Sequence, residues 1–178
     1  KTEVVFPKNE ATDMFYTYQD IAVKDREESQ NYDCILKRGV TVLQLDSRSE
    51  IRPDYIKSFK YTITGNCGNV FNPSTGYCLE KTTLTKTYDI SGDRFKAKRF
   101  LFTIYFFLGG DDVTDITLNT QTTDTEDKVV KKLSFENVHM VKGKMTIYKG
   151  PFLSTHSSAS FIIDSPTIPD SGFSTEFE

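Results

Sequence analysis

The sequence predicts an all-β protein, and three observations lead to that fold class. Short runs of the 178 residues alternate between apolar and polar side chains, which places the apolar ones on one face of a strand. Clusters of Gly, Pro, Asn, Asp and Ser separate these runs. No window of about eleven residues repeats apolar side chains at helical spacing. We therefore expect an antiparallel β-sandwich of about eight short strands, forming a single domain over residues 1–178.

Two segments of the first half show strand character. Tyr32 to Asp46 changes the parity of its apolar residues and contains Gly39, which indicates either a bulge or a strand buried on both sides. Lys57 to Asn66 alternates strictly, so its aromatic and isoleucine side chains share one face of a half-buried strand. The other candidate strands are Met14 to Val23, Leu79 to Ile90, Val113 to Thr122, Val129 to Phe135, Gly143 to Tyr148 and Ser160 to Asp164.

The longest apolar run is Phe100 to Leu108. It is apolar at both parities and lies between Lys98-Arg99 and Gly109-Gly110, which predicts a central strand covered on both faces. The run is far shorter than the roughly 20 residues that a membrane-spanning helix requires.

Composition narrows the function classes. Lys and Arg give 22 positive charges against 25 negative charges from Asp and Glu, and this balance argues against a nucleic-acid partner. Only two His and three Cys are present, so chemistry based on imidazole or metal-bound thiolate has few groups to use. Asp111, Asp112 and Asp115 follow a Gly-Gly turn but lack the spacing of a calcium loop. We predict no enzyme activity, no cofactor and no metal site.

The cysteines allow two interpretations. Cys67 and Cys78 enclose a loop with the strong turn signal Asn72 to Gly76, which could bring the two sulfur atoms within bonding reach. A candidate disulfide between them competes with three separate thiols. We expect Cys34 to lie on a core strand as a small buried hydrophobe.

Phe15, Tyr16 and Tyr18 form an aromatic stretch with two interpretations. Exposed aromatic rings could stack on sugars, as in a carbohydrate-binding module. Alternatively, the stretch is one strand whose alternate residues lie in the core. The sequence alone does not decide between these two interpretations.

Several short segments between Met14 and Asp164 together resemble fimbrillin-like proteins, the pilus subunits and anchors of Gram-negative anaerobes. The segments that carry the resemblance are Met14-Phe15-Tyr16, Ile35 to Val42 (ILKRGVTV), Ile63-Thr64-Gly65, Phe71 to Gly76 (FNPSTG), Leu133 to Val138 (LSFENV) and Lys144 to Gly150 (KMTIYKG). Members of that family usually have two sandwich domains, whereas this length fits one.

The resemblance implies a transthyretin-like sandwich, exported to the cell surface or outer membrane. It implies a pilus subunit, anchor or adhesin that pairs with itself or with other subunits by β-strand exchange at a sheet edge, and that contacts a host protein or glycan. Such proteins reach the membrane through a lipid anchor, which this sequence does not contain. Residues 1–13 and 165–178 are expected to be extended, and the candidates for exchange are Lys1 to Phe6 and Ser160 to Glu178. The alternative is a carbohydrate-binding module or a glycan-binding surface lipoprotein.

Overall fold

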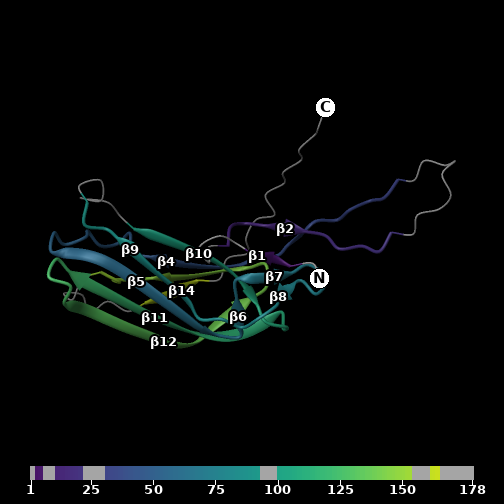
Figure 1. Ribbon diagram of the computed structural model, residues 1–178. Helices are drawn as coiled ribbons and strands as arrows, with labels where there is room; N and C mark the ends of the chain where they lie inside the picture. The colour runs from purple at the N-terminus through teal and green to yellow at the C-terminus, as the bar shows by residue number, and fades with distance from the viewer. Residues whose placement is uncertain (1–2, 6–10, 22–30, 93–99, 154–160, 165–178) are drawn as a thin grey trace.

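The computed structural model describes residues 3–5, 11–21, 31–92, 100–153 and 161–164. These residues form strands and turns, and no helix among them could cross a membrane (Figure 1). Several strands have only two or three residues, so the described part of the chain contains more and shorter strands than expected. The strands are β1 (Val4–Val5), β2 (Phe15–Tyr16), β3 (Lys37–Arg38), β4 (Thr41–Asp46), β5 (Ile56–Gly65), β6 (Cys67–Gly68), β7 (Val70–Asn72), β8 (Tyr77–Cys78), β9 (Leu84–Asp89), β10 (Leu101–Leu108), β11 (Val113–Asp124), β12 (Val129–Val141), β13 (Met145–Lys149) and β14 (Ile162–Asp164).

Two sheets form the body of the molecule (Figure 1). One has the strand order β14-β13-β4-β10-β6, and the other has the order β12-β11-β5-β9. The pairings are antiparallel except that β13 runs parallel to β4. The predicted all-β, antiparallel sandwich is therefore confirmed, with one parallel pair that the sequence pattern did not indicate.

The core lies between these two sheets. Phe59 of β5 is fully buried and stacks on Phe102 of β10, with ring centroids 4.2 Å apart and planes 18° from parallel. Phe152, also buried, meets Phe59 edge to face. The other core residues come from the inward faces of both sheets and include Leu43, Leu45, Tyr61, Ile63, Leu84, Ile104, Phe106, Ile116, Leu118, Val138 and Met140.

The strand predicted at Lys57 to Asn66 is confirmed, and the one predicted at Phe100 to Leu108 is confirmed as an interior strand but not as one covered on both faces. β5 follows the alternation predicted for it, with three buried side chains on one face. β10 is an interior strand between β4 and β6. Its second face is only partly covered: Leu101 is 41% exposed at its start, while Phe107 at its end packs against Val40 and Phe71.

The segment before β4 departs from the prediction. Tyr32 to Asp46 is not one strand, because pairing stops at Gly39 and resumes at Thr41. Cys34 and Leu36 are exposed, so the expected core position of Cys34 is wrong. The physical reason is that this part of the chain has left the sandwich and, within the described ranges, its strand β3 pairs with a segment outside it.

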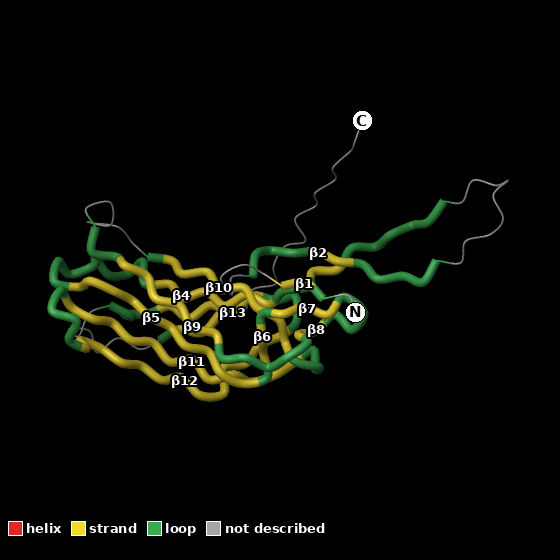
Figure 2. The backbone as a smooth tube through the Cα atoms, in the orientation of Figure 1, coloured by secondary structure: helices red, strands yellow, loops and turns green. Residues whose placement is uncertain are grey.

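That partner segment belongs to the predicted strand Met14 to Val23, of which only Phe15–Tyr16 is a strand; its last two residues lie outside the described part. The register is Phe15 opposite Arg38 and Tyr16 opposite Lys37. Beyond β2 and β3 the two segments stay side by side, since the Gln19 side chain donates a 2.9 Å hydrogen bond to the Asp33 carbonyl. Residues 15–21 and 31–38, which we call the arm, extend away from the sandwich (Figure 2), whereas Ala11 before them is buried with Val40, Phe71 and Phe107 of the body.

β12 is longer than predicted. A register shift separates the pairs Ile116–Val138 and Leu118–Phe135, and Asn137 at the shift has a positive φ of 55°. This β-bulge restores the alternation beyond Phe135, the expected end of the strand, so pairing continues to Val141.

Replacing Phe59 with Ala tests the importance of the central stack. Deleting a fully buried ring leaves a cavity, and we expect the free energy of unfolding to fall by about 3–5 kcal/mol. Lys60→Ala, one residue on and on the exposed face of the same strand, is the control and should change it by less than about 0.5 kcal/mol. Chemical denaturation measures both, and equal effects would contradict the assigned core.

Candidate functional site

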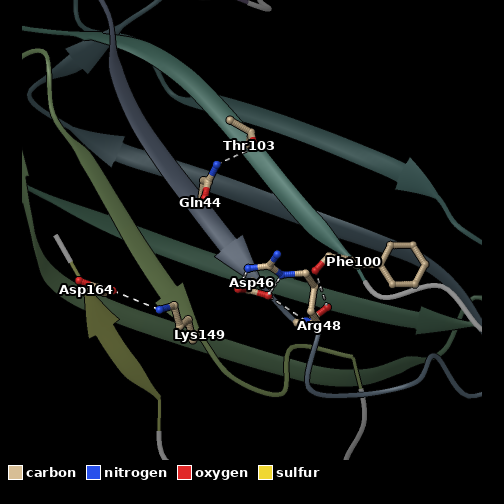
Figure 3. Close-up of polar contacts among 8 residues, drawn as sticks. Gln44, Asp46, Arg48, Phe100, Thr103, Lys149 and Asp164 are labelled. Carbon is tan, nitrogen blue, oxygen red and sulfur yellow. Dashed lines mark hydrogen bonds and ion pairs between the residues drawn. The ribbon is translucent and has the colours of Figure 1, made fainter. Parts of the chain in front are cut away.

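The edge of the five-stranded sheet is the first candidate site, because a terminal segment of the chain occupies it. β14 pairs antiparallel with β13, placing Ile162 opposite Lys149 and Asp164 opposite Ile147. Lys149 Nζ lies 3.1 Å from a carboxylate oxygen of Asp164 (Figure 3). All three residues of β14 are exposed, including Ile162 at 62% and Ile163 at 61%. Little apolar surface is thus buried by the strand itself.

Phe161, the residue before β14, provides the packing that the strand lacks. Its ring meets Phe135 and Phe152 edge to face, with centroid distances of 4.9 and 5.0 Å. Gly150 makes room for it, because a Cβ at that position would collide with the Phe161 ring. One aromatic anchor and a short backbone pairing therefore hold this segment on the sheet.

Polar contacts fix the neighbouring end of β4 (Figure 3). Asp46 is buried, and its carboxylate accepts two hydrogen bonds from the Arg48 guanidinium at 2.9 and 2.6 Å. Arg48, followed by more distant Lys149, holds the pKa of Asp46 below its usual value against the opposing effect of burial. Since the folded pKa is depressed, this contribution to stability is present near neutral pH and is lost as the pH falls through the folded pKa. The Asp46–Arg48 ion pair therefore stabilises the end of β4, the strand that pairs with β13.

A second cluster lies where the arm joins the sandwich. Tyr77 of β8 donates a 2.8 Å hydrogen bond to Asp112, and Lys142 lies 3.7 Å from the centre of the Tyr77 ring. Burial lowers the pKa of Lys142, and nearby Lys37 adds to this effect, while Asp112 opposes it. Tyr16 packs edge to face on Phe71 at 4.8 Å. These contacts fix the base of the arm to the body.

The three candidate glycan-stacking aromatics lie in different surroundings. Phe15 is 39% exposed, and the Arg38 guanidinium covers one face of its ring at 4.9 Å. Tyr16 is engaged by Phe71, as described above. Tyr18 is 55% exposed and lines a groove of about 430 Å³ with Ile35 and the β7–β8 turn. Tyr18 is thus the most open of the three rings, and Phe15 keeps one face uncovered by Arg38.

The two cysteines of the candidate disulfide lie on strands that approach each other, β6 and β8. A Cβ added at Gly68, next to Cys67, would be 3.2 Å from Cys78 Cβ. Both thiols are free in the structure. Burial, with a smaller effect of Cys78, raises the pKa of Cys67 to about 12, so its reactive thiolate is scarce at neutral pH. The disulfide stays a prediction.

The acidic residues after the Gly-Gly turn do not converge. Asp112 accepts a hydrogen bond from the Tyr77 hydroxyl, and Asp115 Oδ1 lies 3.1 Å from His139 Nδ1. Within the described ranges, no three His, Cys, Asp or Glu side chains are grouped so that they could hold a metal ion. Sequence reasoning did not single out Phe161, because an aromatic residue ahead of two isoleucines gives no sign of where it packs.

Comparison with protein families adds one result. A model of a family of unknown function, DUF6562, matches residues 1–176. The chain belongs to this family. No curated protein and no solved structure matches it. The resemblance to fimbrillin-like proteins therefore stays a prediction, and the family name assigns no activity to the edge or to the arm.

Mass spectrometry of an unreduced digest tests the cysteine prediction. A disulfide predicts one linked peptide pair containing Cys67 and Cys78, with Cys34 free. The same digest after brief alkylation of the folded protein should label exposed Cys34 first. Three alkylated thiols under denaturing, unreduced conditions would show that the predicted disulfide is wrong.

Proposed function

We propose that the protein is a non-enzymatic structural protein of the cell surface, a pilus subunit, anchor or adhesin that assembles by β-strand exchange. The observation that carries the proposal is the state of β14 at the sheet edge. A short strand held by one aromatic anchor, one ion pair and a few backbone pairs can be replaced by the same segment of a neighbour without loss of contacts. The family resemblance supports the pilus and outer-membrane parts of the proposal.

The edge has the features that strand addition requires. In strand addition, main-chain hydrogen bonds provide affinity, and pockets for particular side chains provide specificity. β13 offers the backbone of Met145–Lys149, and its other side is already paired to β4. The space over Gly150, between Phe135 and Phe152, is the pocket for an incoming Phe161.

The other terminal candidate for exchange also pairs within the chain. Val4 and Val5 of β1 lie opposite Phe71 and Val70 of β7. This pairing involves two residues, and no side-chain anchor comparable with Phe161 accompanies it among the described residues. We therefore assign the donor role to the C-terminal segment.

The carbohydrate-binding alternative has less support from the geometry. It expects a row of open aromatic rings on the arm, but Phe15 is covered by Arg38 and Tyr16 packs on Phe71. Tyr18 is the most exposed of the three, at 55%. Glycan binding is thus our second proposal, centred on Tyr18.

The test separates the acceptor edge from the donor strand. A chain that lacks Ser160 to Glu178 exposes the edge of β13, and a labelled peptide of residues 160–178 supplies the strand. We expect saturable binding, measured by fluorescence anisotropy, because the peptide restores both the pairing and the anchor.

Matched peptides identify the anchor. Phe161→Ala should weaken binding about tenfold, since a partly buried aromatic anchor with two ring contacts contributes about 1.4 kcal/mol. Ile162→Ala removes an exposed side chain on the same strand and should have little effect. A folded truncated chain that binds no peptide, and a truncation that leaves the self-association of the protein unchanged, would each contradict strand donation.

A further inference from the structure

The arm carries a second, independent feature, which is an ordered pattern of charge on one of its faces. Tyr16 and Lys37 are directly opposite each other, so they point to the same side of the arm. Alternation then places Tyr18 and Asp20 on this side along one segment, and Ile35 and Asp33 along the other. Tyr16, Tyr18, Asp33, Ile35 and Lys37 all line the groove, together with Thr17, Gln19 and the β7–β8 turn residues Pro73, Ser74 and Thr75. We call this side the groove face.

Along the arm, the side chains of the groove face change from basic to apolar to acidic. Lys37 lies at the base, Ile35 beside Tyr18 lies in the middle, and Asp33 lies towards the far end. Each step is two residues, or roughly 7 Å along an extended chain. Ile35 is 75% exposed and Tyr18 is 55% exposed. Lys37 and Asp33 are also exposed, and neither has an ion-pair partner among the described residues.

The order of these side chains is self-complementary, because the basic end in one copy matches the acidic end in a second copy that runs in the opposite direction. A two-fold axis through the level of Ile35 and Tyr18 would bring Lys37 of one copy opposite Asp33 of the other, and the reverse pair would form by symmetry. The same axis would pack the exposed Ile35 and Tyr18 side chains against their own copies, away from water. An isologous interface requires this kind of self-complementary patch.

The surroundings of Lys37 also favour an incoming carboxylate. Lys142 lies nearby at the arm base, where the positive charge of Lys37 lowers the pKa of Lys142, an effect smaller than that of burial. The Asp112 carboxylate lies 3.7 Å from Lys142 Nζ and forms no ion pair with Lys37 within the described part of the chain. A carboxylate from outside would therefore relieve the repulsion at this point, whereas a cationic or purely apolar partner would not.

We propose that two copies of this chain pair their arms through the groove face, with reciprocal Lys37–Asp33 ion pairs around a centre formed by Ile35 and Tyr18. The pairing uses residues remote from β14, so it is a second interface and does not depend on strand exchange. Strand exchange extends an assembly in one direction, and arm pairing joins two chains across a symmetry axis.

Charge reversal in the full-length chain tests the pairing. By sedimentation equilibrium, Lys37→Glu and Asp33→Lys should each weaken dimerisation at least about tenfold, because each brings like charges together twice. An equimolar mixture of the two variants should recover the affinity of the natural chain to within about threefold, since both ion pairs form again with reversed or natural sign. Lys60→Glu, an exposed lysine on β5, is the control and should not change dimerisation.

A cysteine pair tests the axis. In a Cys34→Ser background, Ile35→Cys should form an intermolecular disulfide on mild oxidation, because the axis brings the two position-35 side chains together. Leu36→Cys is comparably exposed but lies on the opposite side of the arm, and should not cross-link.

The charge variants are also measured in a Phe161→Ala background, in which strand exchange is weakened. We expect the same changes in dimerisation in that background, because the arm interface does not use Phe161. A natural chain that stays monomeric at about 0.5 mM would overturn the proposal and assign the arm to a different partner. Charge variants that dimerise as well as the natural chain, or a mixture that shows no recovery, would also overturn it.

Discussion

The contact between Phe59 and Phe102 holds the two sheets face to face, and the other features of the molecule follow from it. The stacked rings, with Phe152 against them, close the inner faces of β5 and β10 over a dry core. Burying those faces leaves only the strand edges and the exposed outer surfaces for contacts with other molecules. An edge with a free row of backbone donors and acceptors must be blocked or paired. In this chain, the terminal strand β14 covers one such edge.

The alternation of apolar and polar residues was enough to predict which face of a strand is buried. Phe59, Tyr61 and Ile63 share a parity, and that parity decided the buried face of β5. The apolar run at Phe100 to Leu108 likewise identified an interior strand. Irregularities in strand pairing that depend on distant contacts were harder to predict. Asn137 gives no local sign of a bulge, because the shift arises from pairing with β11.

The arm explains the largest error. Cys34 and Leu36 look like core residues, since apolar side chains at alternate positions usually mark a buried face. They are exposed because, among the described residues, their segment lies beside residues 15–19 and not against the sandwich. The position of Phe161 over Gly150 was similarly beyond the sequence, because residues 11 positions apart meet there only after β13 and β14 have paired. Features that depend on a sheet edge or on an anchoring side chain can be located only when the fold is known.

The central claim is that a weakly held terminal strand lies on the edge of a firmly packed sandwich. Amide hydrogen exchange measured by nuclear magnetic resonance tests it most directly, because exchange reports the local free energy of opening. The account predicts that the amides of Ile162–Asp164 exchange at least about a hundredfold faster than the hydrogen-bonded amides of Leu101–Leu108, without unfolding of the core. Equal protection of the two strands would contradict it, because β14 would then open only when the whole sandwich unfolds.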